Sequence, residues 1–343
     1  MSGTREVEAS ASTALASRED AIGSSRASQP AVSDVGEFGL IEQVAQRLRG
    51  VDAEHVLVAP GDDAAVVAMP DGRCVVTTDM LVEGVHFRRD WSEAYDVGRK
   101  AAAANLADVA AMGARGSGLV VGLGMPPDLP VEWVLALADG LRDEAAGVGA
   151  VVVGGDMAKS PVVTVSVAAI GELDGREPVT RAGASEGDLV AVCGQLGRAA
   201  AGLALLRRGF RSPRALVDAH RRPQPPYAAG VTAAVSGATA MCDVSDGLLA
   251  DLGHVATASG VAIVIDPHTL EVDAALADAA AALGADPMEF LLTGGEDHAL
   301  AATFAPGSVP DGWLVVGQVA AGAGVTVLGR SDFGALGYDH FAG

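Results

Sequence analysis

The chain has 343 residues, enough for two domains of ordinary size, and half of them are hydrophobic while only 4% are aromatic. Its 23 Lys and Arg against 44 Asp and Glu give a net charge of −21, which argues against nucleic acid and an anionic membrane as partners. No apolar run reaches the roughly 18 residues of a spanning helix, and three widely spaced cysteines fit neither a disulfide framework nor a zinc site. We therefore expect a cytoplasmic protein with reduced thiols.

The first half of the chain alternates between strand and helix patterns after an unpatterned start. Residues 1–34 are rich in Ala, Ser, Arg and Glu without apolar periodicity, so we expect a disordered tail. An N-terminal domain is predicted over 35–172. Its predicted elements are a helix within 36–50, strands within 55–69 and 74–87, an Ala-rich helix over 96–114, a strand at 118–125, a helix at 130–150, and strands at 151–157 and 161–173.

The second half, residues 173–343, is predicted to form a C-terminal domain of the same class. A strand within 179–197, a helix at 198–210, a Pro-rich stretch at 220–230 and a strand at 260–266 give an α/β or mixed α+β fold. Between them lies "MCDVSDGLLADLGH", residues 241–254. Because Ser and Asp favour helix starts, we expect the strand to end near Asp243 and the helix to begin near Ser245 or Asp246.

Acidic residues follow one apolar run after another. Taken singly, each is explained as a turn or a helix cap. Asp108 is different, because it lies on the Ala-rich helix three residues after Asn105, on the same face, where an acid has no capping role. In α/β sheets ligands gather at the carboxyl ends of strands, so we expect these acids to converge on one cleft. They are Asp62, Asp63, Asp79, Asp156, Asp243, Asp246, Glu296 and Asp297.

Several carboxylates in one cavity repel each other, which predicts bound cations. Oxygen ligands without His or Cys favour Mg²⁺ or Ca²⁺, and the calcium-loop spacing is absent, so Mg²⁺ with a phosphate ligand is favoured. The familiar phosphate-binding loops are also absent. The Gly-Gly-Asp at 154–156 offers backbone N–H groups, and Arg181 could reach a phosphate. His86 taken alone is more often structural than catalytic.

Nine motifs in order resemble those of the thiamine-monophosphate kinase family over about residues 36 to 341. Each is weak alone, and together they are specific. They are "GEFGLI", "GDDAAVV", "TTDMLVEGVHF", "KAAAANLADVAAMGA", "GGDMAKSP", "VTRAGASEGDLV", "CDVSDGLLADLGH", "GGEDHAL" and "GYDHF".

The resemblance implies a two-domain fold like that of aminoimidazole ribonucleotide synthetase, with an N-terminal domain that dimerises and binds ATP and Mg²⁺. It implies ATP-dependent phosphorylation of thiamine monophosphate to thiamine diphosphate with several Mg²⁺ ions and direct transfer. Matching positions imply metal ligands at Asp63, Thr78, Asp79, Asp108, Asp156, Asp243 and Asp246, the last also catalytic. They imply ATP contacts at Thr77, Gly155, Asp156, Arg181 and Ser245, and substrate contacts at His86 and Glu296.

One position departs from the family pattern. Ala335 stands where an aromatic residue is expected, which leaves Phe333 or Tyr338 to stack on the substrate. Two alternatives remain open: another ATP-using member of the same superfamily, or a non-catalytic homologue that binds Mg²⁺ and nucleotide. The chain lacks the reactive cysteines of selenophosphate synthetase and of the hydrogenase-maturation relative, and it carries the "LVEGVHF" run not expected of aminoimidazole ribonucleotide synthetase.

Overall fold

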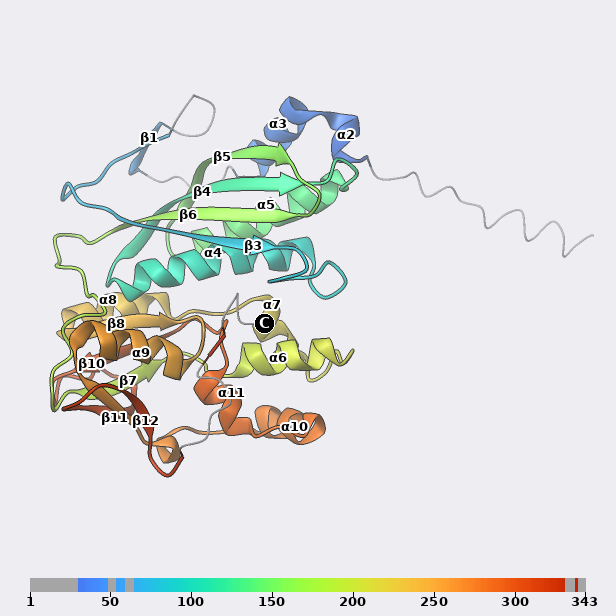
Figure 1. Ribbon diagram of the computed structural model, residues 1–343. Helices are drawn as coiled ribbons and strands as arrows, with labels where there is room; N and C mark the ends of the chain where they lie inside the picture. Colours follow the sequence, from blue (N-terminus) through green and yellow to red (C-terminus); the bar gives the residue numbers. More distant parts are fainter. Residues whose placement is uncertain (1–29, 49–53, 59–64, 331–336, 339–343) are drawn as a thin grey trace, which may run out of the picture.

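The computed structural model describes residues 30–48, 54–58, 65–330 and 337–338 (Figure 1). The N-terminal half forms α2 (Val32–Val35), α3 (Glu37–Leu48), β1 (Val56–Val58), β2 (Val66–Val67), β3 (Val75–Val82), α4 (Ala94–Ala111), β4 (Arg115–Met125), α5 (Val131–Ala146), β5 (Val151–Lys159) and β6 (Thr164–Glu172). The C-terminal half forms β7 (Leu189–Cys193), α6 (Arg198–Arg207), α7 (Arg214–Arg221), α8 (Tyr227–Val235), β8 (Ala238–Val244), α9 (Leu248–Ser259), β9 (Ala262–Ile265), η1 (Pro267–Thr269), α10 (Ala274–Leu283), α11 (Pro287–Thr293), β10 (Ala299–Phe304), β11 (Leu314–Ala320) and β12 (Gly324–Val327).

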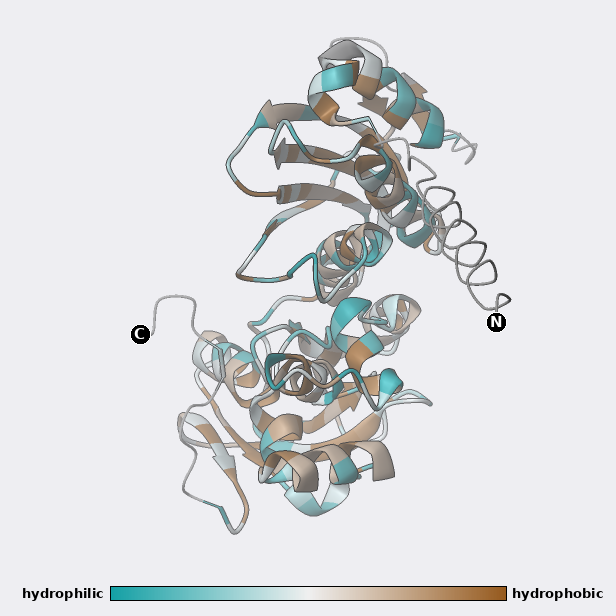
Figure 2. Ribbon diagram, turned by 90° about the vertical axis from the view of Figure 1, so that its right-hand side faces the viewer, coloured by the Kyte–Doolittle hydropathy of each residue, from teal (hydrophilic) through white to brown (hydrophobic). Residues whose placement is uncertain are grey.

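A four-stranded sheet of order β3-β6-β4-β5 forms the N-terminal half, with α4 and α5 on one face (Figure 2). Strands β4 and β5 are parallel, and the other pairs are antiparallel. The two helices cross closely because each has a glycine at the contact. A Cβ on Gly98 would lie 2.1 Å from the Leu137 carbonyl oxygen, and one on Gly140 would lie 2.1 Å from that of Tyr95. This close crossing seats α4 firmly against α5.

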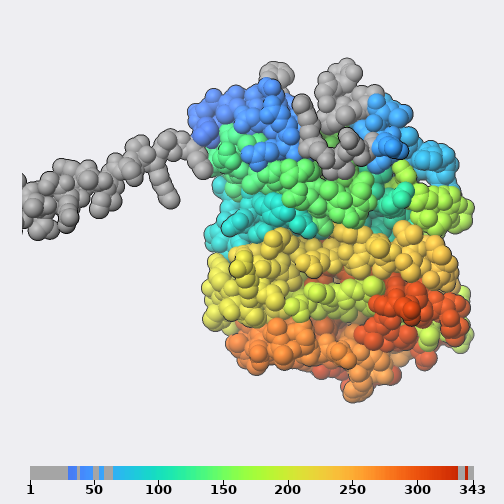
Figure 3. All heavy atoms as spheres, turned by 180° about the vertical axis from the view of Figure 1, so that it is seen from behind, coloured from blue at the N-terminus to red at the C-terminus, as the bar shows by residue number. Residues whose placement is uncertain are grey.

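A six-stranded sheet of order β12-β9-β11-β7-β10-β8 forms the C-terminal half. It is antiparallel except for the pair β12 and β9. The halves are stacked (Figure 3), and α4 lies between them, in contact with β3 on one side and with β8 and α8 on the other (Figure 1). The predicted mixed α+β class is confirmed. Among the described residues, no helix is both long and apolar enough to cross a membrane.

Order begins earlier than predicted within the part of the tail that the structure describes. The helix α2 overlaps the predicted tail, residues 1–34, in all but its last residue, Val35. The N–H groups of Val32 and Ser33 donate to the carbonyls of Leu129 and Pro127 (2.8 Å each). This contact with a loop about a hundred residues away is invisible to a local sequence pattern.

Two further expectations were wrong in detail. Asp79 and Asp156 lie inside β3 and β5 rather than at strand ends, because each strand keeps pairing with its neighbour beyond the acid. The helix after "CDVSD" begins at Leu248, not at Ser245 or Asp246, and its N-cap is Gly247 with φ of 132° and no side-chain cap. The convergence of acids therefore depends on how α4, β3 and β8 pack, and not on a common sheet edge.

Candidate active site

Helix α4 presents two polar side chains to strand β3. The hydroxyl of Thr77 donates to Oδ2 of Asp108 (2.7 Å), and the N–H of Asp79 donates to Oδ1 of Asn105 (2.8 Å). Asn105 is fully buried. The predicted common face of Asn105 and Asp108 is thus confirmed, and it is the face that contacts the strand.

Strand β8 brings a third carboxylate to the same place from the C-terminal half. Asp243 is 3% exposed, and its Oδ2 lies 3.1 Å from Nδ1 of His298. Asp243 pairs in register with Leu300 of β10, so the loop that leads into β10 places His298 beside it. The contact holds the carboxylate of Asp243 in one orientation.

The carboxylates are close enough to affect one another. Burial, together with the negative charge of Asp243, raises the pKa of Asp108 to about 7. Burial also raises the pKa of Asp79, with His298 opposing and Asp243 adding to the shift. Burial would lower the pKa of His298, but its hydrogen bond to Asp243 raises it above the ordinary value. Excess negative charge at this point favours a cation.

Two cavities meet at this cluster. The larger has a volume of about 1040 Å³ and the smaller about 660 Å³. Four residues line both cavities and form a shared wall between them: Thr77, Asp108, Arg181 and Asp243. The guanidinium of Arg181 makes no ion pair with any described residue, so a positive charge is available beside the carboxylates.

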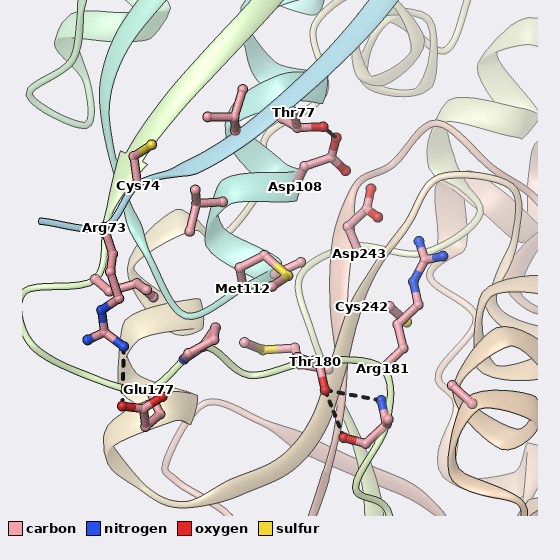
Figure 4. A pocket seen from close by; sticks show the side chains of 18 residues that line it. Arg73, Cys74, Thr77, Asp108, Met112, Glu177, Thr180, Arg181, Cys242 and Asp243 are labelled. Atoms are coloured by element: carbon pink, nitrogen blue, oxygen red, sulfur yellow. Dashed lines mark hydrogen bonds and ion pairs between the residues drawn. The ribbon is translucent and has the colours of Figure 1, made fainter.

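The larger cavity runs from the shared wall along β3 and the connection between the halves (Figure 4). Thr77, Asp108 and Asp243 point toward one another at one end, and Arg73 pairs with Glu177 (3.2 Å) at the other. Between them the lining is mostly apolar and includes Met112. The cavity therefore combines a charged end with a surface suited to a flat, weakly polar group.

The smaller cavity has a different polar group at its base. Glu296 Oε1 lies 2.9 Å from Nζ of Lys100, and its Oε2 lies 3.0 Å from Nδ1 of His220. His86 lines the same cavity, and its Nδ1 accepts the N–H of Val82 (3.0 Å). Burial would raise the pKa of Glu296, but the Lys100 ammonium and His220 hold it well below its usual range. Glu296 is therefore a carboxylate at neutral pH.

The segment Ser245–Gly247 is fixed by two neighbours. Oδ2 of Asp251 accepts the N–H groups of Asp246 (3.0 Å) and Gly247 (3.1 Å). On the other side, a Cβ on Gly295 would lie 2.2 Å from the Ser245 carbonyl oxygen, and the N–H of Glu296 donates to that oxygen (2.8 Å). Asp251, and not Ser245 or Asp246, thus supplies the side-chain acceptor near the start of α9, and it binds N–H groups that precede the helix rather than those of its first turn.

Several predicted site residues lie together, and others do not. Thr77, Asp79, Asp108, Arg181, Asp243, Ser245, Asp246, His86 and Glu296 all line one or both cavities. Thr78 lines the smaller cavity, but it lies on the opposite face of β3 from Thr77, and its hydroxyl donates to the Val167 carbonyl (3.0 Å). Asp63, Phe333 and Ala335 lie outside the described residues. Tyr338 lines the smaller cavity, as its candidacy for stacking requires.

Gly155 and Asp156 stand apart from the other predicted residues. They lie on β5, which is separated from β3 by β6 and β4, so about 14 Å of sheet lies between Asp156 and Asp79. Neither residue lines either of the two cavities. Within this chain, the predicted metal and nucleotide contacts at 155 and 156 are not brought to the cluster.

Four residues that shape the site escaped the sequence reasoning: Lys100, His220, Asp251 and His298. Lys100 carried one usable signal. The chain has only two lysines, and Lys100 directly precedes four consecutive alanines of the predicted helix. A charge on such an apolar face needs a buried partner of opposite charge. His220 and His298 lie beside residues from distant parts of the chain, which no local pattern shows. Asp251 contacts residues four and five positions before it, but its sequence context is that of an ordinary acid in a first helical turn.

Comparison with known proteins agrees with this geometry. Residues 61–173 match the sequence model for AIR synthase related protein, N-terminal domain, and residues 185–328 match that for its C-terminal domain. A thiamine-monophosphate kinase from Mycobacterium tuberculosis is 51% identical over 314 residues, covering 91% of this chain and 93% of that protein.

Two solved structures are similar along most of the chain. Thiamine-monophosphate kinase from Stenotrophomonas maltophilia K279a has a TM-score of 0.75 at 32% identity, over 87% of this chain and 98% of that one. AaThiL complexed with AMPPCP and TMP has a TM-score of 0.74 at 35% identity, over 90% and 97%. With both domains matched and such relatives covering nearly its whole length, the chain belongs to the thiamine-monophosphate kinase family of AIR synthase related proteins.

Proposed function

We propose that the chain transfers the γ-phosphoryl group of ATP directly to thiamine monophosphate, giving thiamine diphosphate and ADP. A phosphate oxygen of thiamine monophosphate bonds to the γ-phosphorus as the bond to the ADP oxygen breaks. One observation carries the proposal: two cavities of unequal size meet at a wall made by Thr77, Asp108, Arg181 and Asp243. Two phosphorylated molecules entering from the two cavities would bring their phosphates together there.

We assign ATP to the larger cavity. Its apolar stretch, with Met112 and Leu173, suits a purine base, and its charged end suits a polyphosphate. Thr77 and Arg181 line this cavity, in keeping with their predicted nucleotide contacts, and Arg181 can bind phosphate in two-pronged fashion. Ser245 lines only the smaller cavity, so its predicted contact would be to the phosphate end of ATP.

We assign thiamine monophosphate to the smaller cavity. Phe290 and Leu203 give the smaller cavity apolar lining, and His86 and Glu296 give it polar groups. The organic part of thiamine carries a positive charge and amino N–H donors, and a carboxylate such as Glu296 is complementary to both. Of the two aromatic residues proposed to stack on the substrate in place of residue 335, Tyr338 is the one the structure describes, and it lines this cavity.

The carboxylate cluster fits Mg²⁺. Among the described residues, no three His, Cys, Asp or Glu side chains form a ready-made metal cage. That agrees with Mg²⁺, which takes one or two carboxylates together with substrate phosphates. Asp79, Asp108, Asp243 and Asp246 are the described residues that would hold Mg²⁺ ions, one or two carboxylates to each ion. Burial and the charge of Asp243 raise the pKa of Asp108, and a bound cation would offset both effects. When bound, Mg²⁺ neutralises the phosphates of both molecules.

The side chains of the site act mainly by positioning the two phosphates and only to a small extent by transferring protons. A phosphate monoester is already anionic, so it needs little help from a general base. Arg181 supplies a positive charge at the junction, and Asp246 is the proposed catalytic carboxylate, on a segment fixed by Asp251. The fixed geometry holds the phosphates of ATP and thiamine monophosphate in line, and this alignment accelerates the transfer.

We also propose that the chain acts as a homodimer through the open face of the four-stranded sheet. Among the described elements, no helix covers the face opposite α4 and α5 (Figure 2). Val76 and Met80 of β3 and Val120 of β4 are exposed there at 64%, 52% and 39%. A second copy on this face would cover an apolar surface that costs free energy in water. Val120→Glu should convert the dimer to monomer in analytical ultracentrifugation, and a monomeric wild type would contradict the proposal.

The proposed reaction is tested by incubating the purified protein with ATP, Mg²⁺ and thiamine monophosphate and by measuring thiamine diphosphate. We expect product only when all three are present, and none when unphosphorylated thiamine replaces thiamine monophosphate. Tight ATP binding without any product would favour a non-catalytic nucleotide-binding homologue instead. A cytoplasmic location stays a prediction, which fractionation of the source cells would test.

A further inference from the structure

The carboxylate of Glu296 is held by two residues from two separate helices. Lys100 lies on α4 in the N-terminal half, and His220 lies on α7 in the C-terminal half. Glu296 itself lies in the loop between α11 and β10. Lys100 and His220 are almost fully buried, with side chains 4% and 2% exposed, whereas the Glu296 side chain is 28% exposed. All three side chains line the smaller cavity, and the carboxylate of Glu296 is the most exposed of them, so it faces the cavity while its two partners are buried around it.

The backbone at Glu296 is fixed in an unusual conformation. Its φ is +68°, a left-handed value that a residue with a side chain seldom adopts. The hydrogen bond from its N–H to Ser245 and that from the His298 N–H to Val244 (3.0 Å) hold the loop against the end of β8. Such strain persists only where the surroundings determine it, and here it directs the side chain toward Lys100.

The contacts leave Glu296 able to bind a ligand. Each carboxylate oxygen has two lone-pair positions, and Lys100 and His220 each approach a different oxygen. The Lys100 ammonium also donates to the His86 carbonyl (3.3 Å), which ties it to the wall of the same cavity. The His220 contact is close in distance, but its ring nitrogen lies off the direction of a good hydrogen bond. The Lys100 charge lowers the pKa of Glu296 more than the His220 charge does, and its contact is the shorter, so Lys100 is the stronger of the two partners.

We propose that Lys100 and His220 are positioning residues that aim Glu296 at the organic part of the acceptor, so that the acceptor cavity is complete only when both halves are docked. This inference rests on the proposed function, because it deepens the role of Glu296 in binding thiamine monophosphate. Without Lys100, the buried side of the carboxylate loses its cation, and Glu296 turns toward water and away from the ligand.

A second ion pair between the two halves serves as a matched control, because its loss would weaken their docking without touching Glu296. Nε of Arg222, at the end of α7, lies 3.3 Å from Asp96 of α4, so this ion pair joins the same two helices. Neither residue lines the smaller cavity. Arg222→Met removes a pair between the halves and leaves Glu296 with both of its partners.

The test compares Lys100→Met, His220→Asn and Arg222→Met by steady-state kinetics, with thiamine monophosphate and ATP varied separately. We expect Lys100→Met to raise the KM for thiamine monophosphate about tenfold or more and His220→Asn to raise it about threefold, with the KM for ATP within about twofold. Arg222→Met should change neither. The proposal is overturned if both cavity variants keep the wild-type KM for thiamine monophosphate, or if Arg222→Met raises it as much as Lys100→Met.

A second measurement keeps the test decisive if Lys100→Met folds poorly. Adding Glu296→Gln to Lys100→Met removes the unpaired buried carboxylate, so the double variant should melt at a higher temperature than Lys100→Met alone. A double variant no more stable than the single one shows that Lys100 does not act on Glu296. If the wild type binds thiamine monophosphate in calorimetry but makes no product, the proposed reaction fails, and the binding constants of the same variants still decide this inference.

Discussion

Asp251 offers a sharp test of how the site is built, because one of its oxygens holds the segment that carries Asp246. Oδ2 accepts the N–H groups of Asp246 and Gly247, and Asp251 is 2% exposed. In Asp251→Asn, the amide oxygen can still accept both N–H groups. In Asp251→Ala, both lose their partner, which should cost about 1 to 3 kcal/mol of folding free energy. Displacing Asp246 should then lower kcat between about tenfold and a hundredfold.

The two variants should also differ in how their stability depends on pH. Burial raises the pKa of Asp251 to about 7, with the charge of Asp243 adding to the shift. In the unfolded chain its pKa is about 3.9, so between about pH 4 and pH 7 the folded state binds a proton that the unfolded state lacks. Stability from this group therefore falls as pH rises through that window, by about 2.5 kcal/mol between about pH 5 and pH 8.

The side chain of Asp251→Asn has no proton to lose. The stability of this variant relative to the wild type should therefore rise by about 2.5 kcal/mol between about pH 5 and pH 8. Urea unfolding at both pH values, with a chelator present to remove metal ions, gives the two differences directly. Asp251→Ala serves as the control that loses both the titration and the hydrogen bonds. Parallel pH profiles for wild type and Asp251→Asn would refute the reasoning, since they would show that the buried carboxylate does not carry the proton.

Three further predictions each concern one side chain, two of them in the site and one outside it. Asp246→Asn should abolish thiamine diphosphate formation with an unchanged circular dichroism spectrum and melting temperature, and wild-type activity would mean that the metal ligands are misplaced. Thr77→Val removes the 2.7 Å hydrogen bond to Asp108, so the Mg²⁺ concentration for half-maximal rate should rise about fivefold, and an unchanged value would contradict this coupling. Tyr227→Phe removes the 2.6 Å hydrogen bond from its hydroxyl to Glu144, which should cost about 1.5 to 3 kcal/mol in urea unfolding and leave kcat unchanged.

The order and type of the main elements could be predicted from the sequence because they depend on local patterns. The Ala-rich helix and the apolar strands each carry a clear period, and both appear at the expected places. The start of α9 could not be placed, because Ser245 and Asp246 are good capping residues in isolation. Contact with Gly295 and the hydrogen bonds that Asp246 and Gly247 donate to Asp251 keep these residues out of the helix.

The candidate site was predictable as a set of acids, but not as a geometry. Asp108 was identified as unusual because an acid on an apolar helix face needs a partner, and Thr77 is that partner. The same reasoning marks Lys100 as a charge that needs a partner, but it does not show that the partner is Glu296. Lys100 and His220 lie on helices 120 residues apart in sequence, and they meet only because the two halves dock.

The most direct test of the proposed reaction is a single turnover with ATP labelled in its γ-phosphate, Mg²⁺ and thiamine monophosphate, with the enzyme in excess. If the two substrates meet at the wall between the cavities and transfer is direct, the label should appear in the terminal phosphate of thiamine diphosphate, with one ADP formed for each product. Label recovered on the protein, or released as inorganic phosphate without thiamine diphosphate, would contradict direct transfer at this site.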